Sequence, residues 1–416
     1  MAPAISPLAP ASFPVLPAIA GVRLGVAACG LRYQGRTDLL VAELAAGTTV
    51  AGVFTKSTAI SAPAAWCRAH VKRGKARAII DNSGNANAFT GKVGEASVKR
   101  TAGAAAELLG CKPGEIFIAS TGIIGVPLPD EKITAALPGV FKGAMTATWE
   151  AAARAIMTTD TFPKGAARGA DIAGVPVKIA GIAKGSGMIA PNMGTMHVFI
   201  FTDAAIPARV LQPLVKSSAD RSFNCITVDS DTSTSDTVLL AATGQVKHKA
   251  VKAPGDAHLK AFRAKLDEVM LDLAHQVIRD GEGATKFIEI RVTGAATAAS
   301  AKRLGLAVAN SPLVKTAIAG EDANWGRIIA AVGKSEEPCD MNRIVIAIGG
   351  VPITAKGMMR PDYDEAPVAR HMKGPNILIE IDAGLRKNAK PAPGRATVWT
   401  CDLTHAYIDI NIGYRS

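Results

Sequence analysis

The sequence lacks the features that mark a disulfide-bonded, zinc-bound or membrane-inserted protein. Its six cysteines are scattered along 416 residues, with no C-x-x-C pair and no histidine at metal-ligand spacing. We therefore expect neither a disulfide framework nor a zinc site. We expect a reducing, cytoplasmic environment. Residues 1–17 are apolar but contain no Lys or Arg and are interrupted by five prolines, which argues against a signal peptide or a membrane span.

Aromatic residues are also scarce, at 5% of the chain, whereas the formal net charge is +12. The densest basic segment is residues 68–77, RAHVKRGKAR. A nucleic-acid-binding segment would be expected to carry interleaved aromatic residues or a known motif, and this one has neither. The segment predicts a solvated basic face, and nucleic-acid binding is the weaker alternative. A basic surface would also attract anionic amino-acid substrates.

Short apolar segments alternate with helical patterns along the whole chain, which predicts a layered α/β fold. Strands are expected at residues 39–44, 49–55, 78–80, 116–119, 197–201, 287–292, 344–348, 377–381 and 397–401. Helices are expected at residues 95–109, 149–157 and 259–277. The segments at 120–122 and 82–87 are expected to be a tight turn and a polar loop, because Ser, Asn and Gly favour turns.

The most informative segment is residues 184–196, KGSGMIAPNMGTM. Small residues precede Thr195, and an apolar, strand-like segment follows it. If the bond between Gly194 and Thr195 is cut, the new α-amino group of Thr195 lies beside its own hydroxyl. An α-amine titrates near neutral pH and can act as the general base that an internal threonine lacks. The segment therefore predicts self-cleavage that creates an N-terminal threonine nucleophile.

Together with other motifs, this segment resembles the ornithine acetyltransferase family, whose usual pattern is K-G-[SA]-G-M-[IL]-x-P-x-x-A-T-M. Two residues depart from the family: Gly194 replaces the usual alanine, and His197 replaces the usual leucine. The other matching segments lie at residues 53–56, 82–88, 119–125, 157–161, 280–286, 320–327 and 407–411. The resemblance thus covers nearly the whole chain.

The resemblance implies a layered αββα fold, shared with N-terminal-nucleophile aminopeptidases, and two chains, residues 1–194 and 195–416. It implies that Thr195 is the nucleophile and that Thr121 and the Gly122 backbone form an oxyanion hole. It also implies that two such αβ pairs assemble as α2β2, without a metal or an organic cofactor. The substrate-binding residues that it implies are Thr158, Lys184, Thr195, Glu282, Asn411 and Ser416.

The implied reaction moves an acetyl group from N2-acetylornithine to glutamate through an acetyl-Thr195 intermediate, in arginine biosynthesis. Some relatives also accept acetyl-CoA as donor, and the sequence leaves that second activity open. The main alternative is an aminopeptidase or amidase that uses the same nucleophile but passes the acyl group to water. The motifs beyond Thr195 favour the transferase.

Overall fold

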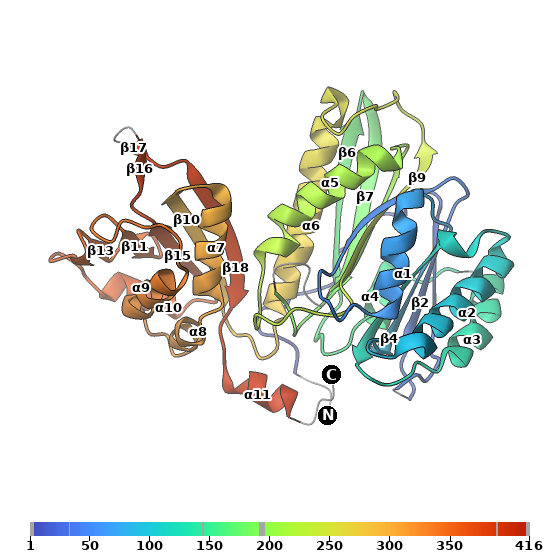
Figure 1. Cartoon of the computed structure of the whole chain (residues 1–416), viewed down its shortest axis with the longest axis horizontal. Helices are drawn as coiled ribbons and strands as arrows, with labels where there is room; N and C mark the ends of the chain where they lie inside the picture. The colour runs from blue at the N-terminus through green and yellow to red at the C-terminus, as the bar shows by residue number, and fades with distance from the viewer. Residues whose placement is uncertain (1–3, 33, 144, 191–195, 388–389, 413–416) are drawn as a thin grey trace. The chain divides into compact units, whose positions relative to one another are not determined.

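The computed structural model describes residues 4–32, 34–143, 145–190, 196–387 and 390–412, which fold into two compact units (Figure 1). The double-sheet unit is formed by Pro10–Asn224 and Asp231–Val277. The single-sheet unit is formed by residues 4–9, Cys225–Ser230 and residues 278–412. Neither boundary coincides with the proposed cut before Thr195, so the division into residues 1–194 and 195–416 stays a prediction about processing.

Two sheets form the centre of the double-sheet unit. Sheet A has the strand order β1-β2-β4-β5, with β4 and β5 parallel, and consists of β1 (Val22–Ala27), β2 (Leu39–Leu44), β4 (Ala78–Asn85) and β5 (Ile116–Ile123). Sheet B has the order β3-β9-β8-β7-β6, with β8 and β9 parallel, and consists of β3 (Thr49–Phe54), β6 (Lys164–Ile172), β7 (Val175–Lys184), β8 (His197–Ala204) and β9 (Thr237–Val246).

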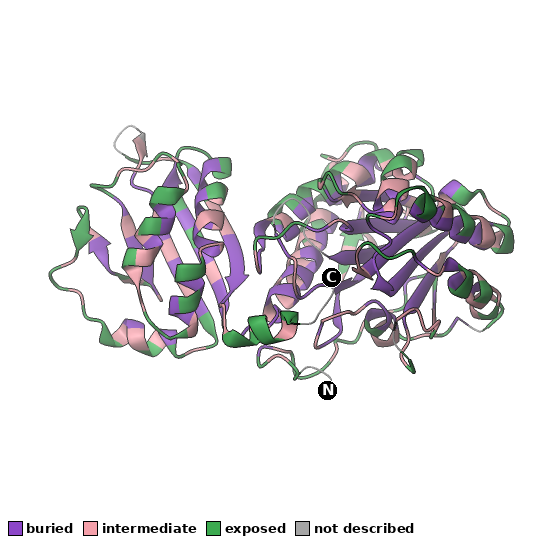
Figure 2. Ribbon diagram, turned by 60° about the horizontal axis from the view of Figure 1, so that its bottom comes forward, coloured by how far each residue is buried: buried purple, intermediate pink, exposed green. Residues whose placement is uncertain are grey.

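The two sheets pack face to face through a continuous apolar core. Alternate residues of each strand, such as Ile79 and Phe117 of sheet A and Ile182, Phe199 and Leu239 of sheet B, meet in this core. The inner strands of both sheets and β5 are accordingly buried along most of their length, whereas the edge strands β1, β3 and β6 are more exposed (Figure 2). Residues that alternate with these face outward from the sandwich and require a second layer to cover them.

Helices supply that second layer on both sides. On sheet A, α2 (Gly91–Leu109) and α3 (Asp130–Lys142) pack on the outer residues of the strands. On sheet B the cover is α5 (Ala208–Arg221) and α6 (Lys260–Arg279), and Leu273 of α6 lies directly over Gly181 of β7. The order helix, sheet, sheet, helix is the predicted αββα arrangement, and that prediction is confirmed.

Two further helices close the sides of the sandwich. The first, α1 (Ala62–His70), contacts β5 and β3, and α4 (Trp149–Ala155) contacts β1, β6 and β7. Ser61 caps α1 by accepting a hydrogen bond from the Ala64 N–H, and Thr148 caps α4 in the same way. Each closing helix therefore joins an edge of sheet A to sheet B.

Two sequence-based expectations are wrong, and both concern sheet A. The Ser-Thr-Gly segment at 120–122 is part of β5, not a turn, and residues 82–85 continue β4 instead of starting a loop. The two segments pair with each other in parallel register, Ser83 with Thr121 and Gly84 with Gly122. The ladder supplies hydrogen-bond partners for backbone N–H and C=O groups of both segments, so these polar residues are stable as strands.

The single-sheet unit has one five-stranded sheet of order β12-β11-β15-β10-β18, with α7 (Ala298–Ala309) packed on β10 and β18. Its strands are β10 (Phe287–Ala295), β11 (Val345–Ile348), β12 (Val351–Pro352), β15 (Asn376–Asp382) and β18 (Gly394–Cys401). Its other helices are α8 (Pro312–Ala319), α9 (Trp325–Lys334), α10 (Ala366–Met372) and α11 (His405–Asn411), and two short hairpins are β13 (Thr354–Ala355) with β14 (Met358–Met359) and β16 (Arg386–Lys387) with β17 (Lys390–Pro391).

Candidate active site

At one end of the inter-sheet core, the side chains that face inward change from apolar to polar. Following the alternation, Ile79 is succeeded by Asp81, Ile182 by Lys184, and Phe199 is preceded by His197. We call this end the polar layer; none of its residues is more than 2% exposed. Its members are Asp81, Ser83 and Thr121 of sheet A and Lys184, His197 and Thr237 of sheet B.

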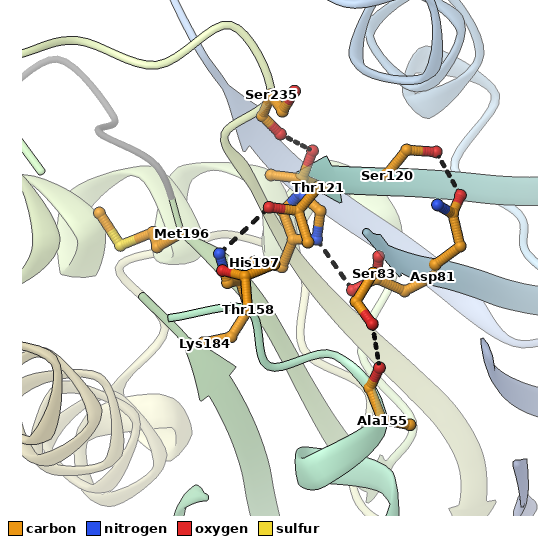
Figure 3. A network of polar contacts seen from close by, with 12 residues as sticks. Asp81, Ser83, Ser120, Thr121, Ala155, Thr158, Lys184, Met196, His197 and Ser235 are labelled. Carbon is orange, nitrogen blue, oxygen red and sulfur yellow. Dashed lines mark hydrogen bonds and ion pairs between the residues drawn. The ribbon is translucent and has the colours of Figure 1, made fainter. Parts of the chain in front are cut away.

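The polar layer brings together two of the predicted site residues, Thr121 and Lys184. The ammonium group of Lys184, at the end of β7, donates a hydrogen bond of 3.1 Å to the Thr121 hydroxyl on β5 (Figure 3). A lysine ammonium can only donate, so the Thr121 oxygen is the acceptor in this contact. The hydroxyl hydrogen of Thr121 is therefore available for another acceptor.

Gly122 follows Thr121 in β5 and has a backbone conformation that excludes a side chain. Its φ is +132°, and a Cβ atom built on it would lie 2.3 Å from the Gly84 carbonyl carbon of β4. Glycine is required here both by the conformation and by the close approach of β4. The predicted oxyanion pair thus lies on a strand, held rigidly against its parallel neighbour.

Thr158 lies close to Lys184, because the backbone N–H groups of Thr158 and of Gly185, the residue after Lys184, both donate to the Asp160 carboxylate. The Thr158 N–H donates to Asp160 Oδ2 at 3.0 Å, and the Gly185 N–H donates to Asp160 Oδ1 at 2.7 Å. Lys164 forms an ion pair with the same carboxylate at 2.6 Å, with both side chains fully buried. Burial opposes the ionisation of Asp160, but Lys164 and Lys184 prevail and hold its pKa below the ordinary range.

The start of β8 is anchored by a second buried carboxylate, that of Asp236. Gly194 and Thr195 lie outside the described residues, but the N–H of Met196, the next residue in the sequence, donates to Asp236 Oδ1 at 3.0 Å. Burial raises the pKa of Asp236 well above its ordinary value, although this N–H and the charge of Lys184 oppose the rise.

Sequence reasoning missed a contact that joins the two sheets within the polar layer. His197 Nδ1 lies 2.8 Å from Asp81 Oδ2, with both side chains fully buried, as Figure 3 shows. His197 is also the residue of β8 that pairs with Lys184 of β7. Among the described residues, neither His197 Nε2 nor Asp81 Oδ1 has a hydrogen-bond partner. The available signal was a polar residue at an inward position of each apolar strand.

Two other predicted substrate-binding residues meet in the single-sheet unit. The Asn411 side chain at the end of α11 donates to Glu282 Oε2 at 2.8 Å. Gly283 has a φ of +73°, and a Cβ atom there would lie 2.6 Å from the Tyr407 nitrogen of α11. The C-terminal helix therefore packs against the turn that carries Glu282. Ser416 lies outside the described residues.

Residues that could hold a metal ion do not gather in the part of the chain that the structure describes: it contains no cluster of three or more His, Cys, Asp or Glu in ligand geometry. Likewise, none of the described helices is long and apolar enough to cross a membrane. The expected absence of a metal and of a cofactor stays a prediction.

Comparison with known proteins identifies the family. A model of the ArgJ family matches residues 23–416. The chain belongs to the ArgJ family. It is 54% identical over 412 residues to a protein from Gluconobacter oxydans, covering 99% of this chain and 96% of the relative. It is 55% identical over 415 residues to a protein from Ruegeria pomeroyi, covering 99% and 98%. Both relatives are named arginine biosynthesis bifunctional protein ArgJ.

A solved structure of ornithine acetyltransferase from Mycobacterium tuberculosis, complexed with ornithine, is 33% identical. The match covers 43% of this chain and 94% of that chain, with a TM-score of 0.37. The predictions of family membership and of an acetyltransferase enzyme are thus confirmed by the ArgJ match and its curated relatives.

Proposed function

We propose that this ArgJ-family chain moves an acetyl group from N2-acetylornithine to glutamate, with Thr195 as the acetyl carrier. The relatives are named for arginine biosynthesis, which supports acetyl transfer in that pathway. The single observation that carries the proposal is the buried contact between Lys184 and Thr121 in the polar layer. It supplies a polarised hydroxyl donor at the end of the sandwich where β8 begins, two residues after Thr195.

Maturation is the first reaction in this proposal. The Thr195 hydroxyl attacks the Gly194 carbonyl, the acyl group moves from nitrogen to oxygen, and water hydrolyses the resulting ester. The Asp236 carboxylate supports this step because it fixes the N–H of Met196, the peptide unit that follows Thr195. The products are an α chain, residues 1–194, and a β chain, residues 195–416.

The oxyanion formed in each step is stabilised by Thr121 and Gly122. Lys184 occupies a lone pair of the Thr121 oxygen, so the hydroxyl hydrogen can be donated to the oxyanion, and the lysine charge strengthens it as a donor. The Gly122 N–H is the second donor. Such donors are already oriented before the reaction, so they stabilise the transition state without reorganisation.

Acetyl transfer then proceeds in two halves. The Thr195 hydroxyl attacks the acetyl carbonyl of N2-acetylornithine while the α-amine accepts its proton; the C–N bond breaks, and ornithine leaves with a proton. The α-amine of glutamate next attacks the acetyl ester, and the Thr195 oxygen leaves and regains its proton. Lys184 suits a substrate carboxylate and Glu282 an ammonium group, and Thr158, Asn411 and Ser416 complete the proposed binding residues.

The deciding experiment follows both halves with purified protein. Wild type should run as two chains on a denaturing gel, the second beginning at Thr195. Incubated with N2-acetylornithine alone, its β chain should gain one acetyl group on Thr195, and glutamate should discharge it to acetylglutamate. Thr195→Ala should stay as one chain without activity, whereas the control Thr195→Ser keeps a hydroxyl and should retain both reactions at a reduced rate.

Two outcomes would overturn parts of the proposal. An uncut but fully active wild type would exclude self-cleavage. Acetate released at the same rate with and without glutamate would favour the aminopeptidase or amidase alternative. The same assay with acetyl-CoA in place of N2-acetylornithine tests the second donor, which the word bifunctional in the relatives' names supports. The mass of the native assembly tests α2β2.

A further inference from the structure

A cavity of the double-sheet unit lies at the edge of sheet B, along β3. It has a volume of about 680 Å³ and lies among β3, α1, the short helix η1 (Val71–Arg73) and α5. None of the described residues proposed for acetyl transfer lines it. A volume of this size is in the range of pockets that bind small organic molecules, about 300–1,000 Å³.

Positively charged side chains converge on this cavity from four segments of the chain. They are Lys56, just after β3; Arg68, on α1; Lys72, on η1; and Arg209 and Lys216, on α5. Among the described lining residues the one acid is Asp220, which lies 3.7 Å from Lys216. Arg68 and Lys72, which belong to the basic segment at residues 68–77, therefore line the same cavity as Arg209 and Lys216 of α5.

The edge of β3 adds a backbone donor to these charges. Sheet B ends at β3, so every second N–H of this strand points away from β9. The N–H of Val50 is satisfied by the Gly74 carbonyl and that of Gly52 by the Gln212 side chain. The same alternation points the N–H of Phe54 outward, and Phe54 lines the cavity. A backbone N–H beside several cations is a recurrent arrangement for binding phosphate.

The same cavity also has an apolar part. Val53, Phe54 and Val71 are half-buried apolar residues of its lining, and Phe54 supplies an aromatic ring. An inorganic anion has no apolar group that could pack on such a surface. An organic body such as a nucleobase can pack on it while its phosphates reach the cations and the Phe54 N–H.

We propose that this cavity binds a nucleotide through its diphosphate group, with Lys72 and Arg209 as its phosphate-binding charges and Phe54 beneath the base. The diphosphate can belong to a free nucleotide or to coenzyme A, which carries an adenosine diphosphate group with an added 3′-phosphate. The lining of this site shares no described residue with those proposed for acetyl transfer. Its test therefore does not depend on the proposed function.

The first experiment measures binding of adenosine diphosphate to the whole protein by titration calorimetry at low ionic strength. We expect saturable binding that weakens as salt is added, because the contacts are partly exposed charges. Lys72→Glu and Arg209→Glu should each weaken binding by about tenfold or more, since each brings a negative charge against the phosphates.

Arg73→Glu is the matched control. Arg73 neighbours Lys72 on η1 and has the same charge, but it does not line the cavity, and its guanidinium lies against Gly114. We expect its affinity to stay within about twofold of wild type, because charges outside the site are screened. All three variants should keep their melting temperature and their acetyl-transfer rate without nucleotide.

The remaining arms identify the source of the diphosphate. Tighter binding of coenzyme A than of adenosine diphosphate supports the site as one for an acyl carrier; equal binding supports a free nucleotide. Adenosine and inorganic pyrophosphate should each bind more weakly than adenosine diphosphate. The proposal is overturned by the absence of saturable binding, by equal weakening in Arg73→Glu, or by single-stranded RNA that binds more tightly and displaces the nucleotide.

Discussion

Sheet B and the sheet of the single-sheet unit both have five strands, but they bury their residues in different ways. All eight residues of β8 in sheet B are buried, because sheet A covers one face and helices cover the other. In the single-sheet unit, β15 alternates between buried and more exposed residues along its length. A polar side chain in β15 can therefore reach solvent, whereas one in β8 must find a partner inside the protein.

This difference indicates where a polar residue of a strand points to a functional site. Glu289 and Arg291 of β10 form an ion pair with each other on the more exposed face of their strand, as surface residues commonly do. Lys184 and His197 lie at inward positions of sheet B, and each is bound to a residue of sheet A. Burial without solvent access makes such contacts expensive to break and suited to a site that requires fixed geometry.

The largest effect is expected from His197→Leu, which introduces the residue usual in the family but leaves the Asp81 carboxylate buried without its partner. The free energy of unfolding of the double-sheet unit should fall by about 3–5 kcal/mol. Adding Asp81→Val removes the buried charge, so the double variant should be more stable than His197→Leu alone. Urea unfolding of the three proteins measures both effects. A single variant as stable as wild type would mean that this contact contributes little.

The next effect concerns activity in place of stability. Thr121→Ala removes the hydroxyl donor of the polar layer, and we expect both half-reactions to slow by about 100- to 1,000-fold. Thr121→Ser keeps the hydroxyl and is the matched control. Single-turnover measurements with N2-acetylornithine, and then with glutamate, report the two halves separately. Slowing of only one half would contradict a shared oxyanion hole.

The two buried carboxylates near the site should respond to pH in opposite directions. The pKa of Asp160 is held low, so its contribution to stability is present above the ordinary carboxyl pKa, about 4, and is lost as the pH falls. The pKa of Asp236 is raised, so the folded protein retains a proton that the unfolded chain releases. Stability is therefore lost as the pH rises from about 4 towards the raised pKa.

Asn substitutions separate these two contributions. Relative to wild type, Asp160→Asn should lose more stability at pH 7 than at about pH 3, because the contribution of the charge that pairs with Lys164 is already partly lost at the lower pH. The stability of Asp236→Asn should increase relative to that of wild type over the same rise in pH, because asparagine cannot ionise. Melting temperatures between these pH values test the signs, and parallel curves for both variants would contradict the assignment.

The smallest effect is expected on the exposed face of the single-sheet unit. Arg291→Ala removes an ion pair of 2.6 Å whose arginine side chain is 51% exposed. We expect a change in the free energy of unfolding of no more than about 0.5 kcal/mol, because exposed pairs gain little over solvation. Urea unfolding gives this value directly, and a loss comparable with that of His197→Leu would invalidate the comparison between the two sheets.

Much of the fold follows from the pattern of apolar residues. The strand at Leu39–Leu44 and the end of α2 at Gly110 are as predicted; Gly110 adopts the left-handed conformation that ends helices. The apolar face predicted at residues 259–277 coincides with the buried side of α6 and the short turn before it. In each case a local signal and the tertiary packing agree, so the sequence is sufficient.

The continuations of β4 and β5 were not predictable in the same way. Asn82, Ser83 and Gly84 favour turns when they are considered alone, and only the parallel ladder with β5 makes them a strand. The contact between His197 and Asp81 joins residues 116 positions apart, which no local pattern reveals. The family resemblance predicted Thr121 and Lys184 as site residues, whereas the hydrogen bond between them was seen only in the structure.

The pairing of β7 with β8 has a consequence for any chain that is cut between them. These strands are antiparallel neighbours from Ile179 opposite Thr202 to Lys184 opposite His197, in the interior of sheet B. Scission within residues 185–196 would leave each fragment contributing strands to one uninterrupted ladder. Separating the fragments would require the sheet to open at its centre, in effect global unfolding. A processed enzyme of this topology should therefore not exchange fragments with other copies under native conditions, and its two chains would share one lifetime.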